Sequence, residues 1–290
     1  MAGSNYDKAV LITGCSSGIG ECVARGLKAR GYRVFASARA DVDVARLADE
    51  GFEAVRLDLR DSESMRAALE TVLERTGGTL YALFNNGAYG QPGAVEDLAT
   101  DVLRDVFETN FFGWHELTCG VLPVMRRQGY GRIIQNSSVL GLVALKWRGA
   151  YNASKFALEG LTDTLRMELS GSGVYVSLIE PGPIESRFRQ NSYAAFKANI
   201  DVENSVHRES YRRVEARLAK QDSSEPFTLP GEAVLDKVVR ALESRRPRPR
   251  YYVTVPTYAF GFLRRVLPTR WLDAALQSVS GGEHRRIDAP

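Results

Sequence analysis

Cysteine and histidine are scarce in this chain. Its 290 residues include three of each, namely Cys15, Cys22, Cys119, His115, His207 and His284. No two cysteines form a C-x-x-C pair, and their odd number argues against a disulfide framework. The histidines are too scattered to suggest a zinc site. The sequence therefore predicts a protein without a metal site that resides in a reducing compartment, the cytoplasm.

A long apolar run is also missing. The largely apolar segment 251–263 contains Pro256 and ends before Arg264 and Arg265, so it is too short to span a bilayer about 30 Å thick. The first residues lead into a predicted strand by residue 8 and lack the apolar core of a signal peptide. We therefore expect neither a transmembrane helix nor a secretion signal.

The net charge is low, +3, but it is unevenly distributed. Residues 1–204 carry 22 basic and 25 acidic side chains, whereas residues 205–290 carry 16 basic and 10 acidic ones. A solvated basic surface explains this excess, and contact with an acidic lipid or protein partner is the alternative. Basic blocks with interleaved aromatic residues are lacking, which argues against a nucleic-acid partner.

Short apolar segments alternate with helical segments over the first 180 residues. The expected strands span 8–13, 32–38, 53–57, 80–84, 132–136 and 174–180, and the expected helices lie before residue 30 and at 42–50, 62–76, 101–127 and 150–170. Continuously apolar strands that alternate with helices indicate a parallel sheet covered on both faces. Because crossovers between such strands are right-handed, we predict an α/β fold with a doubly wound, Rossmann-type parallel sheet.

The alternation stops at residue 187. Residues 187–229 are polar and helical in composition, without a strand signal, and an insertion this long is typical of a functional segment. A helix at 231–243, a strand at 251–255 and an amphipathic helix at 272–279 are expected to follow. We predict one domain with three parts: a dinucleotide-binding and catalytic core (1–186), a helical substrate-binding insertion (187–229) and a C-terminal extension (230–290).

Three glycines, Gly14, Gly18 and Gly20, fall between the first expected strand and the first expected helix. Glycine permits a tight turn and a close approach of the backbone to a pyrophosphate. The helix that follows supplies amide groups and the positive end of its dipole. This placement predicts a dinucleotide site, whereas a glycine-rich turn without a ligand is the simpler alternative.

A tyrosine and a lysine on one expected helix suggest acid/base chemistry. Tyr151 and Lys155 are four residues apart and therefore share a helix face. A nearby ammonium favours the ionised phenol, so we expect the pKa of Tyr151 to be lowered from its ordinary value near ~10. Such a tyrosine transfers a proton more readily near neutral pH.

Several motifs in order resemble the short-chain dehydrogenase/reductase family over residues 6–190. They are Thr13–Gly20, Asn85-Asn86-Gly87, Asn110, Ser138, Tyr151 with Lys155, and Pro181-Gly182. The segments 85–90 and 179–184 are similar to the branch that contains bacterial NADP-dependent aldehyde reductases, retinol dehydrogenases and hydroxysteroid dehydrogenases. The order Gly87-Ala88 departs from the family, which commonly has alanine first, but both residues are small.

The resemblance implies four catalytic residues. Tyr151 would act as general acid and base, and Lys155 would lower the pKa of that tyrosine and bind the nicotinamide ribose. Ser138 would bind the substrate oxygen, and it is preferred over Ser137 because it precedes Tyr151 by thirteen residues. Asn110 would hold a water in a proton relay to Lys155, although an asparagine within a helix can also simply cap a kink.

The end of the second expected strand bears on the choice of cofactor. Enzymes that use NAD usually carry an acidic residue there for the ribose 2′-hydroxyl. This chain has Ser37-Ala38-Arg39, and an arginine can form a charge-assisted fork with a 2′-phosphate. NADP(H) is therefore favoured over NAD(H). The resemblance implies a cofactor site that comprises Gly14, Ser16, Ser17, Gly18, Ile19, Gly20, Arg39, Asp58, Leu59, Asn85, Asn86, Gly87, Tyr151, Lys155, Pro181, Gly182, Ile184 and Ser186.

The substrate is expected to be apolar. The residues expected to contact it are Ser138, Leu140, Leu145, Tyr151 and Phe188, which suggest a long-chain aldehyde, a retinoid or a steroid. Core packing is an equal explanation for the leucines. The family often forms dimers or tetramers through helices such as 101–127 and 150–170, so a homo-oligomer is expected. Residues 251–271 are expected either to cover the substrate pocket or to rest on a membrane surface. The competing hypotheses are a non-catalytic NADP(H)-binding sensor or scaffold and a membrane-associated interaction protein, the latter supported by the basic C-terminal third.

Overall fold

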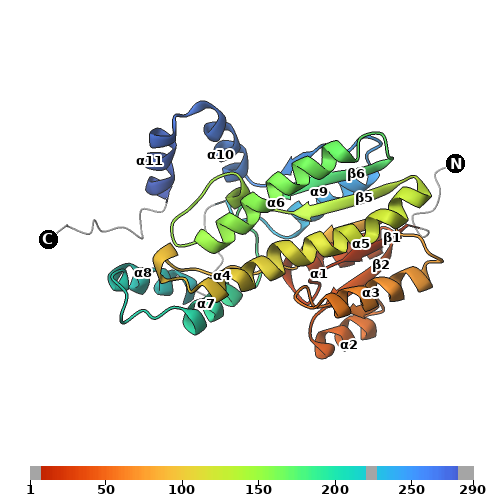
Figure 1. Cartoon of the computed structure of the whole chain (residues 1–290), viewed down its shortest axis with the longest axis horizontal. Helices are drawn as coiled ribbons and strands as arrows, with labels where there is room; N and C mark the ends of the chain where they lie inside the picture. Colours follow the sequence, from red (N-terminus) through yellow and green to blue (C-terminus); the bar gives the residue numbers. More distant parts are fainter. Residues whose placement is uncertain (1–7, 220–226, 280–290) are drawn as a thin grey trace.

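Seven parallel strands form one sheet at the centre of the molecule, a computed structural model in which residues 8–219 and 227–279 are described (Figure 1). The strands are β1 (Ala9–Ile12), β2 (Arg33–Ala38), β3 (Glu53–Arg56), β4 (Ala82–Asn85), β5 (Gly131–Asn136), β6 (Val174–Glu180) and β7 (Arg250–Tyr252). Their order is β3-β2-β1-β4-β5-β6-β7, and the order reverses between β1 and β4. In open α/β sheets, ligands bind at the carboxyl ends of the strands at such a point. The predicted doubly wound sheet is confirmed.

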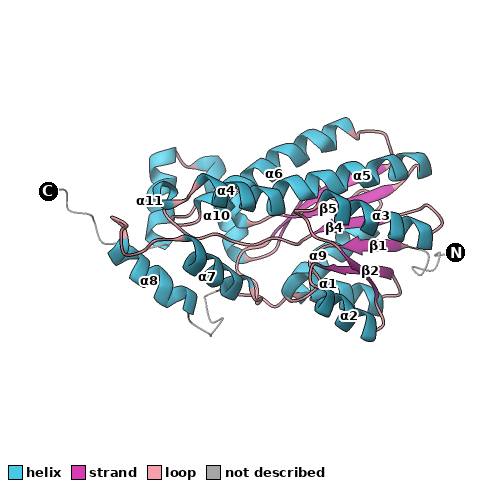
Figure 2. Ribbon diagram, turned by 60° about the horizontal axis from the view of Figure 1, so that its bottom comes forward, coloured by secondary structure: helices cyan, strands magenta, loops and turns pink. Residues whose placement is uncertain are grey.

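The alternating side chains of β1 show how both faces of the sheet are covered. Val10 and Ile12 belong to a core that also includes side chains of α1 (Gly18–Ala29), α2 (Asp41–Asp49) and α9 (Glu232–Glu243). Ala9 and Leu11 belong to a second core with side chains of α3 (Ser62–Arg75), α5 (Gly113–Gln128) and α6 (Gly149–Glu168). All four side chains are buried, as expected for a strand between two layers of helices (Figure 2).

The prediction of a single helix over 101–127 is wrong in the middle of this range. The segment forms α4 (Thr100–Phe107) and α5, separated by a π-helical turn, η3 (Glu108–Phe112). The Gly113 amide donates to the Glu108 carbonyl five residues earlier, which marks the wider turn. Helix propensity does not reveal such a turn, and π turns are frequent at functional sites. Within it, Asn110 is fully buried.

The insertion after β6 is helical, as predicted. It forms α7 (Phe188–Asn199) and α8 (Arg208–Ala219), which pack around a small apolar core of their own. Both helices lie beyond the carboxyl ends of the strands (Figure 1). The two ends of the insertion meet, because the Leu229 amide donates to the Pro183 carbonyl at 3.2 Å and the Glu185 amide donates to the Leu229 carbonyl at 3.0 Å. The part of the insertion at 220–226 lies outside the described residues.

The last predicted strand is shorter than expected. β7 ends at Tyr252, and α10 (Val255–Val266) begins before the predicted strand 251–255 would end. Pro256 lies in the first turn of α10, where its fixed φ angle and missing amide proton are tolerated. The amphipathic helix predicted at 272–279 is confirmed as part of α11 (Thr269–Val279). α10 and α11 project from the body (Figure 1), and no helix in the described ranges is long and apolar enough to cross a membrane.

Candidate active site

The glycine turn after β1 is packed so closely that a side chain would not fit at two of its positions. Gly14 and Gly18 have φ angles of +71° and +60°, which other residues rarely adopt. A Cβ on Gly14 would lie 2.7 Å from the Gly87 Cα, and one on Gly20 would lie 2.1 Å from the Gly14 carbonyl oxygen. Ser17 makes no side-chain capping bond at the start of α1. The amides of this helix terminus are therefore available to an anion.

Side chains join this turn to the neighbouring strand ends. The Thr13 hydroxyl accepts hydrogen bonds from the amides of Asn86 and Gly87, at 2.8 and 2.9 Å. The Asn86 side-chain amide donates to the Thr13 carbonyl at 2.9 Å, and its oxygen accepts a hydrogen bond from Asn136 at 2.9 Å. The carboxyl ends of β1, β4 and β5 are thus fixed together where the sheet order reverses. This cradle fits the pyrophosphate of a dinucleotide.

The predicted adenosine-binding residues follow β2 and β3. Arg39 is exposed directly after β2. After β3, the Asp58 carboxylate accepts a hydrogen bond from the Arg60 amide at 3.0 Å, and the Leu59 side chain would lie 3.0 Å from a Cβ on Gly87. These residues therefore lie on the same edge of the sheet as the glycine turn.

The loop after β6 lies across from the glycine turn. A Cβ on Gly18 would be 3.0 Å from the Ser186 Cβ. The Ser186 hydroxyl accepts a hydrogen bond from the Phe188 amide at 3.3 Å, and the Pro181 carbonyl accepts one from the Val139 amide at 2.8 Å. The loop thus connects the cofactor cradle to the segment that carries Ser138. The other predicted cofactor residues in these two segments are Ser16, Ile19, Gly182 and Ile184.

The side chain of one predicted cofactor residue points away from the cradle, and a residue outside the predicted set connects the cradle to α6. The side chain of Asn85 is fully buried and donates to Gln135 and Thr118, at 3.0 and 3.2 Å, so it points into the interior rather than to the cradle. Asn136, at the end of β5, bonds Asn86 with its side chain and accepts a hydrogen bond from Lys155 with its carbonyl. In the sequence, the position of Asn136 immediately before Ser137 and Ser138 could have marked it as a residue near the site.

Tyr151 lies in the first turn of α6, beside Ser138. Burial raises the pKa of the Tyr151 phenol to about 12, and the hydrogen bond with Ser138 opposes this rise. The ring of Phe188 stands edge-on to the Tyr151 ring, with 5.2 Å between the centroids. The expected lowering of the pKa of this tyrosine is therefore wrong for the structure as it stands, because burial of the phenol outweighs the groups that favour the phenolate.

Lys155 is buried one turn further along α6, with 1% of its surface exposed. Its ammonium donates to the Asn136 carbonyl at 2.8 Å, and it lies 4.1 Å from the centre of the Trp114 ring and 5.6 Å from that of Tyr151. Burial lowers the pKa of Lys155 to about 7, and attraction to Glu159 opposes this change. The lysine is thus in a range where it changes charge near neutral pH.

Adjacent serines face in different directions. The Ser138 hydroxyl accepts a hydrogen bond from the Leu140 amide at 3.1 Å and contacts the Tyr151 phenol. The Ser137 hydroxyl lies on the other side, where a Cβ on Gly141 would meet both this oxygen and Glu159. The structure therefore places Ser138, and not Ser137, beside Tyr151.

Asn110 is held by both ends of its side chain. Its oxygen accepts a hydrogen bond from the Tyr89 amide at 3.1 Å, and its nitrogen donates to the Tyr89 carbonyl at 2.9 Å and to the Ser154 hydroxyl at 3.4 Å. The π turn thus connects the loop after β4 to α6. The side-chain nitrogen of Asn110 is occupied by two of these bonds, and its oxygen accepts one.

The predicted substrate residues differ in their burial and in their contact with Tyr151. Phe188 contacts the ring of Tyr151 directly, Leu140 is buried next to Ser138, and Leu145 is half-buried in the following loop. Sequence reasoning missed that α10 reaches this loop, where the Arg264 guanidinium donates to the Leu142 carbonyl at 2.6 Å.

The substrate loop is also fixed from the side of the insertion. Trp147 adopts a φ angle of +61°, which is uncommon for a bulky residue, and its carbonyl accepts a hydrogen bond from the Gly93 amide at 3.0 Å. Its ring packs edge-on against His207 and Tyr211, with centroids 5.0 and 5.7 Å apart. The loop before α6 is therefore held between the insertion and the loop after β4.

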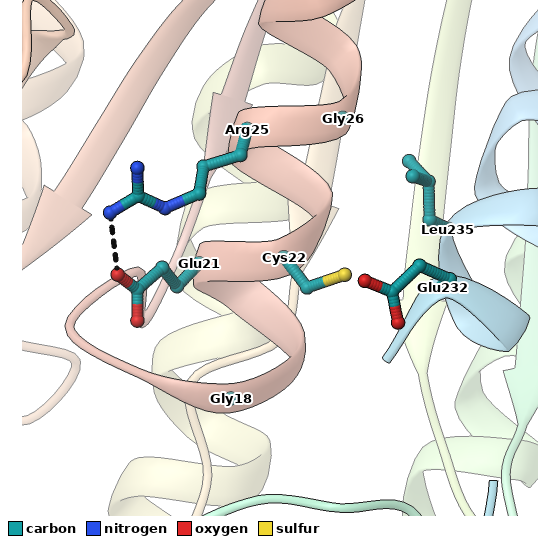
Figure 3. Close-up of a pocket in the computed structure, with 7 residues that line it drawn as sticks. All are labelled: Gly18, Glu21, Cys22, Arg25, Gly26, Glu232 and Leu235. Atoms are coloured by element: carbon teal, nitrogen blue, oxygen red, sulfur yellow. Dashed lines mark hydrogen bonds and ion pairs between the residues drawn. The ribbon is translucent and has the colours of Figure 1, made fainter. Parts of the chain in front are cut away.

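A cavity of about 540 Å³ lies between α1 and α9 (Figure 3). The residues that line it are Gly18, Glu21, Cys22, Arg25, Gly26, Glu232 and Leu235. The Cys22 thiol points toward the Glu232 carboxylate, and burial together with this carboxylate raises the pKa of the thiol to about 11. Such a thiol is unreactive at neutral pH. Within the described ranges, no group of three or more His, Cys, Asp or Glu side chains could hold a metal ion.

Known proteins resemble this chain over most of its length. Residues 8–196 match a family model described as short chain dehydrogenase. An uncharacterised oxidoreductase of Escherichia coli K12, YbbO, is 44% identical over 96% of this chain and 97% of its own length. Human 17-beta-hydroxysteroid dehydrogenase type 1 is 35% identical over 84% of this chain and 77% of its own length.

The fold matches a solved structure over almost its whole length. A short-chain dehydrogenase/reductase from Burkholderia phymatum, crystallised in complex with NAD, is 26% identical. The match has a TM-score of 0.75 and covers 93% of this chain and 95% of the other.

Proposed function

Because the chain belongs to the short-chain dehydrogenase/reductase family, we propose that it interconverts an apolar aldehyde or ketone and its alcohol, with NADP(H) as the cofactor. The family membership makes it an oxidoreductase that acts on CH–OH groups with a nicotinamide cofactor. The observation that carries the finer proposal is the convergence of Ser138, Tyr151 and Lys155 beside the glycine turn.

The side chains of the site account for the proton part of the reaction. The bound cofactor supplies the hydride. Tyr151 would give its phenolic proton to the carbonyl oxygen during reduction, and would take the proton back during oxidation of the alcohol. Ser138, which bonds the phenol, would donate to the same substrate oxygen and stabilise the charge that develops there.

Lys155 would supply positive charge close to the Tyr151 phenol. In its ammonium form, 5.6 Å from the centre of the Tyr151 ring, it favours the phenolate that remains after proton transfer. Asn136 orients this ammonium through its carbonyl oxygen, and Asn110 fixes α6 through Ser154. Both asparagines therefore support the geometry without direct contact with the substrate.

Arg39 supports the preference for NADP(H). It is exposed at the carboxyl end of β2, where an acidic residue would repel a 2′-phosphate and a guanidinium attracts one. By the same argument, Asp58 and Leu59 would border the adenine. Ser186, across from Gly18, would bind the phosphate or the nicotinamide amide.

An apolar substrate is supported by the surroundings of Tyr151. Phe188 covers its ring, and Leu140 and Leu145 lie along the loop that follows Ser138. The name of the human relative refers to a hydroxysteroid, so steroid and retinoid alcohols belong in the test beside long-chain aldehydes.

NADPH oxidation with a panel of aldehydes, ketosteroids and retinal tests the proposal. Tyr151→Phe should lose turnover by about 10²-fold or more, because the ring remains and only the proton is lost. NADPH binding, measured by fluorescence, should persist. Full activity of this variant would refute the role of Tyr151, and no oxidation of NADPH with any carbonyl would favour a non-catalytic NADP(H)-binding sensor.

A contact with membrane surfaces is the second candidate, supported by α10 and α11. Their large exposed apolar side chains are Val255, Tyr258, Phe262, Val266 and Trp271, each at least 53% exposed. Arg265 and Arg270 are exposed beside them, which suits an anionic lipid surface. Flotation with anionic liposomes tests this contact, and wild-type protein that stays with the unbound fraction would reject it.

We further propose a homodimer or homotetramer in the cytoplasm. The exposed ring of Phe112, on the π turn before α5, is an apolar feature of the helices expected to form the interface. Light scattering after size exclusion gives the number of chains. The free cysteines of the described residues, Cys15, Cys22 and Cys119, suit a reducing compartment.

A further inference from the structure

A buried ionic cluster lies one turn along α6 from Lys155, and the proposed mechanism makes no use of it. The Arg250 guanidinium, on β7, donates to Glu159 at 3.0 Å and to Asp163 at 2.7 Å. Its Nε atom lies 3.1 Å from a carboxyl oxygen of Glu180, at the end of β6. The side chains of Glu159 and Glu180 are 9% and 0% exposed. One guanidinium therefore faces three carboxyl groups, of which those of Glu159 and Glu180 are buried.

The three carboxyl groups differ in charge. Burial, with repulsion from Glu159, raises the pKa of Glu180 to about 9, so this group keeps its proton at neutral pH. Burial also raises the pKa of Asp163, but hydrogen bonds from Arg250 and Arg166 outweigh it and lower the pKa. Burial also raises the pKa of Glu159, and hydrogen bonds from Ser137 and Arg250 oppose this rise. Because Glu180 is neutral and Asp163 is shared with a second arginine, Arg250 is the cation that favours Glu159 as a carboxylate.

Glu159 is placed to act on Lys155. The two residues are four apart on α6 and therefore lie on the same face. The remaining surroundings of the ammonium are the Trp114 ring, the Tyr151 ring and the Asn136 carbonyl, which carry no negative charge at neutral pH. Glu159 is the charged group that opposes the effect of burial on Lys155. Interactions between charges are weakly screened in such an interior.

We propose that Glu159 is a positioning residue for the reaction: its carboxylate, fixed by Arg250, is the buried negative charge that keeps Lys155 in the ammonium form. This inference rests on the proposed function, in which the charge of Lys155 assists Tyr151. It gives β7, at the edge of the sheet, a direct part in setting the charge of the active site.

The two oxygens of the Glu159 carboxyl group have different surroundings. One of its oxygens accepts the Arg250 bond, whereas the other is buried without a hydrogen-bond partner among the described residues. The Ser137 hydroxyl, which faces the same space, is among the groups that oppose the rise in the pKa of Glu159 caused by burial. Arg250 therefore holds one oxygen of Glu159 within the cluster, and the other oxygen faces the space beside Ser137.

The test is the pH dependence of turnover in Glu159→Gln, which keeps the shape and removes the charge. Without the carboxylate, Lys155 loses its proton at lower pH. The pH at which kcat falls on the alkaline side should therefore decrease by about one unit or more. A pKa shift of this size needs only a modest change in the interaction energy between Lys155 and its surroundings. The pH dependence of NADPH binding, measured by fluorescence, should move in the same direction and requires no turnover.

Asp163→Asn is the matched control. It removes a carboxylate that also bonds Arg250, on the same helix, but one turn further from Lys155. Its pH profile should stay close to that of the wild type. Equal shifts in both variants, or no shift in Glu159→Gln, would overturn the proposal, since a purely structural cluster would respond to both changes alike.

The test also distinguishes a variant that does not fold from a wild type that has no reductase activity. If Glu159→Gln does not fold, Glu159→Gln/Arg250→Gln removes both partners, leaves no unpaired charge of this pair, and should still move the profile downward. If the wild type reduces no carbonyl, the proposed function fails, and the NADPH-binding titration alone then decides whether Glu159 controls Lys155.

Discussion

The ring of Phe188 covers the ring of Tyr151, edge to face, with 5.2 Å between their centres. Phe188 is the first residue of α7, so the first helix of the insertion begins in contact with Tyr151, the proposed acid/base. A Cβ on Gly90 would lie 2.9 Å from the Phe188 ring, which shows how closely the loop after β4 approaches it. The phenol is thus shielded by a residue from outside the core of the fold.

Phe188→Ala should expose the phenol. Because burial is the cause of the raised pKa of Tyr151, the pKa should fall toward the ordinary value, and the pH profile of the oxidation should begin to rise at lower pH. The KM for a long-chain aldehyde should increase by about tenfold through lost apolar contact. Tyr193→Phe, on the same helix, removes only a hydrogen bond to Glu215 and serves as the control.

Arg39→Ala should change the choice of cofactor. Loss of a charge-assisted contact with the 2′-phosphate should raise the KM for NADPH by roughly tenfold or more, and leave the KM for NADH almost unchanged. Arg56→Ala, at the end of β3, removes an exposed arginine that pairs with Asp41 and should affect neither value. Equal kcat/KM values for the two cofactors in the wild type would contradict the assignment of Arg39.

Lys155→Met should stabilise the fold in a manner that depends on pH. The pKa of the lysine is about 7 in the folded chain and 10.5 when unperturbed, so between these values the unfolded chain binds more protons and wild-type stability rises with pH. The methionine variant lacks this dependence. Its advantage in Tm should be largest below pH 7 and shrink toward pH 10, as measured by thermal unfolding. A constant advantage would show that folding does not change the pKa of Lys155.

Glu180→Gln should show the opposite trend. The folded chain holds a proton on Glu180 up to a pKa of about 9, compared with an unperturbed 4.5, so wild-type stability is full below pH 4.5 and is lost as the pH rises toward 9. Glutamine cannot ionise, and the difference in Tm between variant and wild type should therefore grow over this interval. Asp236→Asn, exposed on α9, should show no such trend.

Much of the fold and part of the site follow from local sequence. The order of apolar segments predicts the parallel sheet, and the glycines at 14, 18 and 20 predict the cradle, because each depends on residues close together in the chain. The π turn at 108–112 was not predictable, since it is favoured by the contacts that Asn110 makes with Tyr89 and Ser154 and not by helix propensity.

Contacts between segments that are far apart in the sequence could not be predicted either. Glu159 and Arg250 are 91 residues apart, and only the placement of β7 beside β6 brings them together. The same holds for the pKa of Tyr151, because its increase comes from burial by the whole fold, whereas the sequence shows only the lysine four residues later. Spacing identifies which residues can share a face, but the number of atoms that cover them is a tertiary property.

The hydrogen bonds between Pro183, Glu185 and Leu229 mean that the insertion leaves and rejoins the core at a single place. A segment closed at its base in this way can change length or sequence with little strain on the sheet, since its ends stay where they are. The segment that bears on substrate selectivity can then diverge during evolution while Ser138, Tyr151 and Lys155 keep their places in the core. A graft of residues 186–228 from a related enzyme should accordingly carry over its substrate preference while the acid/base residues remain untouched.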